Sequence, residues 1–446
     1  MRREILMPSV TPSMKDGKIS RWHVAEGQAV SAGDLLVEVA TSSATLEIEA
    51  ENEGRVERIL VPAGTEGVKV NTPIAVLFGS ATASGPRAPA VTAPLAFASL
   101  EPLPRTKPVS PDRPVPVAAL LGAGPTFREA LRDALAAEMR RDPEVFLIGA
   151  DVAQNRGAMR VTQGLLDEFG PERVVSAPTV DEAVLGLAVG AAFAGLKPVV
   201  ELSSWGRSMD VIGPYLVSAS ETFYLSGGRL PVPIVFRGAN GFVPGMTGQD
   251  ARCVAAQLVQ IPGLKVVQPA SAAAASVLLQ AAIRDPGPVA VLEDAQLYGM
   301  RDTAAFGDVA WIGAARIARS GTDVTIVAAG HAVLVALEAA AVLARAGVEA
   351  EVVDLMSLRP LDREAVVSSV ARTGRLLTVE EGWGEGGIGA EIIACVTSSC
   401  FRDLKSPPLR LSGASLPMPY AAELQASARP GPDQVVGAVL ALVRGA

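Results

Sequence analysis

Short apolar runs alternate with longer helical stretches from residue 127 onward. The runs include VFLIGAD, PVVEL, PIVFRG and VAVLED, and AAAASVLLQAAIRD is one of the helical stretches between them. Buried strands that alternate with helices are typical of a parallel sheet covered on both faces. A second set follows Thr303, with DVTIVAAG, EAEVVDL, RLLTVEE and LRLSG. The pattern predicts two doubly wound α/β domains in tandem, over residues 121–303 and 304–446.

The first 78 residues have a different pattern, in which apolar and polar residues alternate over short runs. Gly, Asp, Asn and Pro separate these runs, as in ILMPSVTPSMKDGKISRWHVAEGQAVSAGDLL. Alternation of this kind is typical of half-buried strands, so residues 1–78 are expected to form a small all-β domain. Within it, VEVATSSATLEIEA predicts two strands joined by a turn at residues 41–44. Asp16-Gly17 predicts another turn, between Lys15 and Lys18.

Residues 79–120 are rich in Ala and Pro and show no sustained apolar period. Proline favours extended backbone, so this segment is expected to be a semi-stiff linker.

Composition narrows the class of protein and its partners. A chain of 446 residues with 49% hydrophobic content fills two or three cores rather than one. The net charge is −8 and the basic residues are dispersed, so we expect no nucleic-acid partner. No apolar run reaches the roughly 18 residues of a membrane span, so we expect no membrane partner and a cytoplasmic protein. Cys253, Cys395 and Cys400 form no CxxC pair, which indicates reduced thiols.

The N-terminal pattern resembles lipoyl and biotinyl domains, which are barrel-sandwiches. In lipoyl domains a Thr-Asp-Lys-Ala turn presents the lysine that receives lipoic acid. Here the turn reads Thr41-Ser42-Ser43-Ala44, with Ser43 at the lysine position. Serine has no amine, so no covalent lipoate is expected.

The remainder resembles the β subunit of the thiamine-dependent pyruvate dehydrogenase component, almost without gaps over residues 125–440. The resemblance is carried, in order, by segments that include FREALRDALAAEMRRDPEVFLIGADV, VTQGLLDEFGPERVV, IPGLKVVQPASAAAA, AAIRDPGPVAVLED, VEEGWGEGGIGAEI and PMPYAAELQ. It implies a transketolase-like pyrimidine-binding domain followed by a transketolase C-terminal domain. Some bacterial members of this family carry an N-terminal lipoyl domain on an Ala/Pro linker, which is the arrangement seen here.

The resemblance also implies partners and cofactors. The family's α subunit holds Mg²⁺ and the diphosphate of thiamine diphosphate through a GDG motif, which this chain lacks. An α subunit would therefore complete the site in an α₂β₂ heterotetramer that serves a dihydrolipoamide acyltransferase core. A structural K⁺ is implied at five backbone carbonyl groups, those of Ile234, Ala282, Ile283, Asp285 and Gly287.

The family's first site position is the glutamate of a TPISE segment, which relays a proton to the pyrimidine ring of the cofactor. The corresponding segment, APTVDEAVLG, places Asp181 at that position with Glu182 beside it. An Asp side chain is one methylene shorter, and proton relay needs heavy atoms about 3 Å apart. The alternative role of Asp181 and Glu182 is to begin a helix, where acids complement the helix dipole.

The segment ELSSWGRSMD differs from the family at further positions. Arg207 occupies the place of a Phe that lies against the pyrimidine, and Ser203 replaces a Met. If this stretch is extended, Trp205 lies on the same face as Arg207 and offers a substitute stacking surface. The alternative is a Trp buried in the core.

The family's active-site histidine is Asp250 here, in RGANGFVPGMTGQDARC. An anion about 4 Å from the carboxylate of a 2-oxo acid is repelled by up to about 4 kcal/mol at an effective dielectric constant of 20. Arg207 or Arg252 could neutralise Asp250. The result is either a rebuilt polar site for another substrate or an idle pocket with a surface ion cluster.

One of the two histidines, His331, follows a strand at its carboxyl end, where ligands of α/β sheets lie. A formal GxGxxG at Gly384, Gly386 and Gly389 lies inside a segment that the resemblance explains, so it does not indicate a nicotinamide cofactor.

Two functions follow from these observations. The chain is a working β subunit that decarboxylates a 2-oxo acid and passes the acyl group to lipoamide. Alternatively, it is a degenerate paralogue with a role in assembly, in regulation or in another thiamine reaction.

Overall fold

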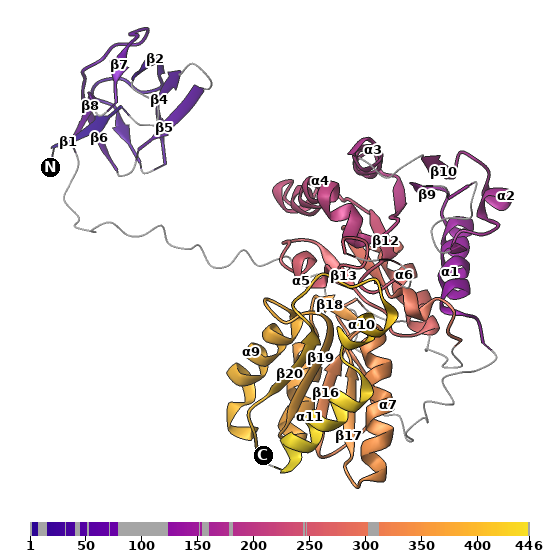
Figure 1. The fold of residues 1–446 in the computed structure, drawn as a ribbon. Helices are drawn as coiled ribbons and strands as arrows, with labels where there is room; N and C mark the ends of the chain where they lie inside the picture. The colour runs from indigo at the N-terminus through magenta and orange to yellow at the C-terminus, as the bar shows by residue number, and fades with distance from the viewer. Residues whose placement is uncertain are drawn as a thin grey trace. The chain divides into compact units, whose positions relative to one another are not determined.

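The structure is a computed structural model in which the chain forms two compact units, Met1–Pro108 and Val109–Ala446 (Figure 1). It describes residues 2–7, 16–31, 33–40, 45–50, 53–70, 72–78, 124–150, 152–153, 160–177, 182–243, 246, 248–301 and 312–444. The boundaries expected at residues 78, 120 and 303 stay predictions.

The N-terminal unit is all-β, as the alternating pattern predicts. Two four-stranded sheets have the orders β1-β8-β6-β3 and β5-β4-β2-β7, and all of their neighbouring strands are antiparallel. Alternate residues such as Ile19, Val39 and Val56 fill the core between them. The strands are β1 (Arg2–Leu6), β2 (Asp16–Trp22), β3 (Ala29–Val30), β4 (Leu35–Ala40), β5 (Thr45–Glu49), β6 (Gly54–Ile59), β7 (Val68–Lys69) and β8 (Pro73–Phe78).

One local prediction in this unit is wrong. Asp16 and Gly17 do not form a turn; they begin β2 and pair with β7. Lys18 on the same strand forms an exposed ion pair with Glu66, 2.7 Å long. The turn of residues 41–44, with Ser43, lies outside the described residues, although the strands on either side of it pair antiparallel as expected.

The second unit contains a seven-stranded sheet and a five-stranded sheet. The larger has the order β10-β9-β11-β12-β14-β13-β18 and is parallel except at β18. Its strands are β9 (Val145–Ala150), β10 (Val174–Ala177), β11 (Lys197–Glu201), β12 (Val235–Ala239), β13 (Lys265–Val267), β14 (Val289–Glu293) and β18 (Ser357–Arg359). The prediction of a parallel sheet is therefore confirmed, with one antiparallel edge that the sequence did not indicate.

The five-stranded sheet has the order β15-β17-β16-β19-β20 and is parallel except at β15. Its strands are β15 (Arg316–Arg319), β16 (Val324–Ala328), β17 (Ala350–Asp354), β19 (Leu376–Trp383) and β20 (Leu409–Gly413). Strand β18 lies between β17 and β19 in the sequence but pairs with β13, so the second α/β domain contributes an edge strand to the sheet of the first.

Helices cover both faces of each sheet. On the larger sheet α1 and α6 pack together over one face, while α3 and α4 pack over the other. On the smaller sheet α7 and α11 cover one face, and α8 and α9 cover the other. The helices are α1 (Phe127–Arg141), α2 (Leu165–Phe169), α3 (Glu182–Phe193), α4 (Trp205–Leu225), α5 (Ala255–Leu258), α6 (Ala272–Arg284), α7 (His331–Arg345), α8 (Arg363–Thr373), α9 (Ile388–Cys400), α10 (Ala422–Ser427) and α11 (Pro432–Arg444).

Local sequence signals explain where several helices begin. Thr126 and Glu129 form a reciprocal capping box at the start of α1. Ser204 and Ser271 accept backbone N–H groups at the starts of α4 and α6. Among the described residues, no helix combines the length and apolarity that a bilayer crossing requires.

Candidate active site

The junction between β11 and α4 differs from the expected extended stretch. Ser204 is the N-cap, with its hydroxyl accepting the backbone N–H of Arg207, and α4 begins at Trp205. The Trp205 side chain is fully buried, and its Nε1 donates to the carbonyl oxygen of Val291 over 3.0 Å. Trp205 is therefore a core residue, and the stacking surface expected there is not available.

Arg207 and Asp250 form a bidentate ion pair beside this junction. Arg207 Nε lies 2.7 Å from Asp250 Oδ1 and Nη2 lies 2.8 Å from Oδ2. The Ser204 hydroxyl donates to Oδ1 over 3.3 Å. The hydrogen bond from Arg207, with its positive charge, lowers the pKa of Asp250 below the usual range, and the Ser204 hydrogen bond acts in the same direction. Asp250 is therefore an anion at neutral pH, and Arg207 is the arginine that neutralises it.

Solvent reaches this pair. The side chain of Arg207 is 63% exposed and that of Asp250 is 23% exposed. Forked guanidinium–carboxylate contacts fix orientation well, but solvent screening makes the energy of an exposed pair small. Each partner can therefore exchange its contacts for those of a charged ligand at modest cost.

Gly206 allows the loop that carries Asp250 to approach α4. A Cβ at this position would collide with the carbonyl oxygen of Gln249 and lie 3.0 Å from Arg252 Cβ. The close approach places Asp250 against the first turn of α4, within reach of Ser204 and Arg207. The Gln249 side chain also hydrogen-bonds Asp210 on α4.

The acids expected at the TPISE position are described only in part. Asp181 lies outside the described residues. Glu182 is the first residue of α3, is exposed, and follows the carboxyl end of β10, so the helix-start role holds for Glu182. Its position at the carboxyl edge of the parallel sheet also leaves it accessible to a ligand.

Beneath this edge lies a buried group of charges that the sequence analysis missed, here called the Arg237 cluster. Arg237 on β12 bonds Glu293 on β14 through Nε and Nη2, both at 2.6 Å, and bonds Glu201 on β11 through Nη1. The Tyr298 hydroxyl donates to Glu293 over 2.6 Å. Burial, with the negative charge of Glu293, raises the pKa of Tyr298 well above its usual value, so the phenol keeps its proton. The available signal was charge inside apolar runs, as in PIVFRG and VAVLED.

A second group, the His331 cluster, joins the two α/β domains. His331 Nδ1 lies 2.9 Å from Glu381 Oε1, and the His331 backbone N–H donates to Asp294 over 3.3 Å. Arg429 Nη1 and Gln296 Nε2 donate to the same Glu381 oxygen, at 3.1 and 3.2 Å. His331 therefore lies in a group of partly buried and buried charged side chains, and a functional role for it stays a prediction. Asp294 and Glu381 were missed, although Asp294 directly follows β14 and Glu381 lies near the carboxyl end of β19.

Burial and neighbouring charge shift the protonation of this cluster. Burial, with the charge of Glu381, raises the pKa of Asp294 to about 7. Burial alone would lower the pKa of His331, but the hydrogen bond to Glu381 and the charge of Asp294 outweigh it and raise the pKa. One ligand atom each of Asp294, His331 and Glu381 lie within 4.8 Å of one another. Arg429 already donates a hydrogen bond to the Glu381 carboxylate. The group is therefore better suited to sharing protons than to binding a metal ion.

The five expected K⁺ positions cluster around the end of α6. Ile234 O accepts the N–H of Val289, Ala282 O accepts the N–H of Asp285, and Ile283 belongs to α6. The Asp285 side chain accepts the backbone N–H of Gly287 and pairs with the Lys265 ammonium, with Nζ–O distances of 2.6 and 2.5 Å. A cation thus already lies at this loop, beside carbonyl oxygens that each keep a second lone pair.

Three family models match consecutive parts of the chain. The biotin-requiring enzyme model matches residues 3–77, the transketolase pyrimidine-binding domain matches residues 123–301, and the transketolase C-terminal domain matches residues 313–435. A solved structure described as a split-gene transketolase, an inactive β4 tetramer, is similar with a TM-score of 0.58 and 23% identity. The similarity covers 72% of this chain and 99% of that chain, and it supports the fold alone.

Similar proteins extend the comparison to the full length. The chain is 44% identical to the pyruvate dehydrogenase E1 component subunit beta of Rhizobium meliloti (strain 1021), over 98% of this chain and 99% of that protein. It is also 44% identical to the same subunit of Rickettsia conorii (strain ATCC VR-613 / Malish 7), over 70% of this chain and 97% of that protein. The mitochondrial subunit beta-2 of Oryza sativa subsp. japonica is 47% identical over 70% of this chain and 85% of that protein. The chain therefore belongs to the family of pyruvate dehydrogenase E1 component β subunits.

Proposed function

We propose that the chain is the β subunit of a 2-oxo acid dehydrogenase that uses thiamine diphosphate and passes an acyl group to lipoamide. The observation that carries the proposal is the full-length similarity to the Rhizobium meliloti subunit, which includes the N-terminal unit. The pyrimidine-binding family match over residues 123–301 supports the choice of cofactor.

The cofactor would be shared with an α subunit that binds its diphosphate and Mg²⁺. Asp181 and Glu182 are the acids proposed to hold the aminopyrimidine, and the exposure of Glu182 at the sheet edge supports this role. When bound, the cofactor supplies the carbanion that attacks a 2-oxo acid. The described residues fit only part of this group, because Trp205 is buried and offers no stacking face.

The Arg207–Asp250 pair gives this site a chemistry different from that of a histidine. A bare Asp250 carboxylate about 4 Å from a substrate carboxylate would cost up to about 4 kcal/mol at an effective dielectric constant of 20. Pairing with Arg207 removes most of this repulsion. Arg207 is exposed and can turn one edge of its fork toward the carboxylate of a 2-oxo acid while keeping Asp250 on the other.

The remaining assignments concern structural ions and partners. A K⁺ at the loop of Ile234, Ala282, Ile283, Asp285 and Gly287 would bind through backbone carbonyls, which tolerate side-chain change. The N-terminal unit, with Ser43 at the attachment position, would carry no covalent lipoate and would dock on the acyltransferase core. A cytoplasmic location stays a prediction.

A second function is favoured by one observation, the anionic and paired state of Asp250. An aspartate fixed in this way cannot cycle its proton near pH 7 as a histidine does. This favours a degenerate paralogue that acts in assembly or regulation, or in another thiamine reaction.

The test is decarboxylation of pyruvate and of longer 2-oxo acids, followed with an artificial electron acceptor. The full chain is copurified with its α-type partner and supplied with thiamine diphosphate and Mg²⁺. We expect turnover, and we expect Arg207→Gln to raise KM at least tenfold because Asp250 then faces the substrate unpaired. Arg363→Gln is the matched control, since Arg363 forms a similarly exposed pair with Glu391 on α8 and α9. A complex that assembles but turns over none of these substrates would replace the first function with the second.

A further inference from the structure

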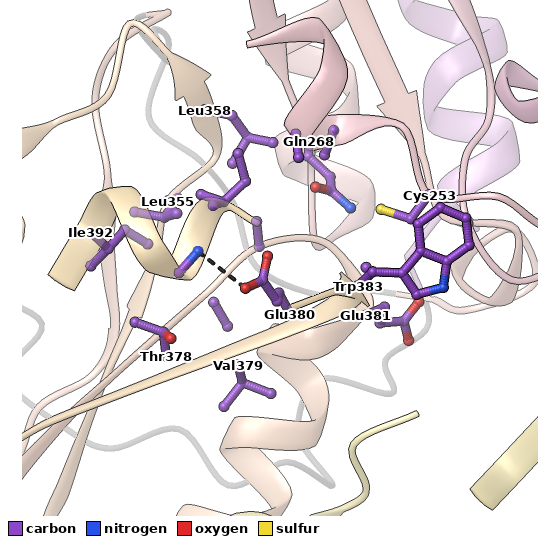
Figure 2. A pocket seen from close by; sticks show the side chains of 18 of the residues that line it. Cys253, Gln268, Leu355, Leu358, Thr378, Val379, Glu380, Glu381, Trp383 and Ile392 are labelled. Atoms are coloured by element: carbon purple, nitrogen blue, oxygen red, sulfur yellow. Dashed lines mark hydrogen bonds between the residues drawn. The ribbon is translucent and has the colours of Figure 1, made fainter. Parts of the chain in front are cut away.

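A cavity that is partly open to solvent lies between the two α/β domains, apart from the Arg207–Asp250 pair. Its volume is about 160 Å³ (Figure 2). An apolar protein cavity of about 150 Å³ holds a molecule the size of benzene, so this cavity has room for roughly six heavy atoms. Asn240, Cys253 and Gln268 line it from the first domain, and most of the other lining residues belong to the second.

One side of the cavity is apolar. Leu355, Leu358 and Ile392 project into it from the segment after β17, from β18 and from α9 (Figure 2). Val327 and Ile388 extend the same surface. A hydrocarbon chain placed here would leave water for an environment like the protein core, which favours binding by roughly 25 cal/mol per Å² of apolar surface buried.

The other side carries negative charge. Glu380, Glu381 and Glu385 all line the cavity, and its lining includes no Lys, Arg or His. Cations that do not line the cavity contact two of these acids, Glu380 and Glu381. Arg410 Nη2 lies 3.3 Å from Glu380, and Arg429 and His331 bond Glu381.

An unpartnered hydroxyl lies in the same wall. The Thr378 residue is 1% exposed and its Oγ1 has no hydrogen-bond partner among the described residues. Buried polar groups are nearly always paired, so an orphaned one that lines a cavity indicates a missing ligand or water. Burial also raises the pKa of the neighbouring Glu380, which lacks full compensation for its charge.

We propose that this cavity binds a small organic cation, with an ammonium group on a branched apolar chain of about four to six carbons. The ammonium would lie by Glu380 and Thr378, supplying the hydrogen-bond donors that both can accept. The chain would lie against Leu355, Leu358 and Ile392. The Trp383 residue is 40% exposed and lines the same cavity beside Glu380 and Glu381.

Occupancy would connect this cavity with the Asp250 loop. Val254 donates its backbone N–H to the Asn240 side chain over 2.9 Å, so residues 240 and 254 close the loop at its base. Asn240 and Cys253 line the cavity, and Asp250 lies three positions before Cys253. A ligand would therefore stabilise the two domains together and steady the loop between them.

The experiment is isothermal titration of the full chain with three probes of one shape. These are 3-methylbutan-1-amine, 3-methylbutan-1-ol and 3-methylbutanoate, which are a cation, a neutral molecule and an anion at pH 7. We expect the amine to bind at least about tenfold more tightly than the alcohol, and the carboxylate not to bind. The amine should also raise the unfolding temperature of the chain.

Variants locate the binding. Glu380→Gln should lower the affinity for the amine about tenfold and leave that for the alcohol unchanged. Glu391→Gln, at an exposed acid on the nearby helix α9, is the matched control and should change neither. Glu380 accepts the backbone N–H of Gly389 at the start of α9 over 3.2 Å, so its loss could disturb the helix. Thr378→Val is therefore the second variant, because the Thr378 hydroxyl has no hydrogen bond to lose. This substitution should lower the affinity for the amine several-fold.

Three results would overturn the proposal. Equal affinity for amine and alcohol would make the cavity merely apolar. If the amine at about 10 mM gave neither a heat of binding nor a rise in the unfolding temperature, the cavity would not be a binding site for it. Unchanged amine binding in both Glu380→Gln and Thr378→Val would place the binding elsewhere.

Discussion

The Arg237 cluster and the Arg207–Asp250 pair use the same chemistry at two depths of one sheet edge. Glu201 ends β11, and Ser204, three residues later, is the N-cap of α4, so the two groups arise from one strand–helix junction. The side chains of Arg237, Glu201 and Glu293 are at most 3% exposed, whereas Arg207 is 63% exposed. The same guanidinium–carboxylate contact therefore has different energetic consequences in the two groups.

The degree of burial decides how much an ion pair contributes to stability. Buried charges have lost their hydration and depend on each other, so removing one partner leaves the other with an uncompensated charge. Exposed charges keep most of their hydration, so their pairing contributes little stability and can be exchanged. The Arg237 cluster thus acts as a structural clamp that holds three strands together. The Arg207–Asp250 pair, the outer pair, is available to a ligand.

The largest effect expected from this comparison is that of Arg237→Met. It leaves the carboxylates of Glu201 and Glu293 buried without their cation, so the free energy of unfolding should fall by roughly 3–5 kcal/mol. Denaturant unfolding of the full chain measures this value. Replacing Glu201 and Glu293 with Leu in the same variant should recover most of the loss, because no buried charge then remains. Failure to recover it would mean that the clamp contributes more than charge compensation.

The next effect concerns the contact that holds the outer pair together. Gly206→Ala places a Cβ against the carbonyl oxygen of Gln249, so the Asp250 loop must move away from α4. We expect roughly 1–3 kcal/mol of destabilisation from this overpacking, and loss of the Arg207–Asp250 contact. Gly190→Ala on α3 is the control, because a Cβ there meets nothing within 4 Å. Equal effects of the two substitutions would contradict the close approach.

Sequence patterns anticipated most of the sheet architecture, and the failures have physical reasons. A strand such as β9, VFLIGA, is buried on both faces and reads as a continuous apolar run. The antiparallel edges β15 and β18 are only four and three residues long, and their partners lie far away in the sequence. No local period marks such strands.

The site was harder to predict than the fold because it depends on tertiary neighbours. The Arg207–Asp250 pair was anticipated from the two residue types, but the helix that begins at Trp205 was not. Ser204 is a good N-cap residue and was the available signal for that helix. In the His331 cluster, His331 is 37 residues from Asp294 and 50 residues from Glu381, a separation that no motif covers.

The His331 cluster predicts that the free energy of unfolding depends on pH. The size of this effect should lie between those of substitutions in the clamp and in the outer pair. The folded pKa of Asp294 is raised to about 7, so between about pH 4 and pH 7 the folded chain holds a proton that the unfolded chain lacks. The contribution of this group to stability is therefore present at low pH and is lost as the pH rises through 7. The raised pKa of His331 acts in the same direction above about pH 6.5.

Asp294→Asn should make the decline in the free energy of unfolding from pH 5 to 7 shallower, by roughly 1 kcal/mol per pH unit. Asp167→Asn, at an exposed position on α2, should leave the slope unchanged, and equal slopes in all three proteins would refute the assignment.

The smallest effect is the one that separates the two regions most clearly. Arg207→Met removes the same guanidinium–carboxylate geometry as Arg237→Met, but Asp250 keeps access to water and to the Ser204 hydroxyl. The free energy of unfolding should therefore change by less than about 1 kcal/mol, and this change should shrink as salt is added. The pKa of Asp250 should rise toward its ordinary value, because the Arg207 hydrogen bond and charge that lower it are gone. Denaturant unfolding at low and high salt measures the first effect, and NMR titration of the Asp250 carboxyl measures the second. A loss comparable to that of Arg237→Met would mean that the outer pair is also structural, and that Arg207 is held too firmly by Asp250 to turn toward the carboxylate of a substrate.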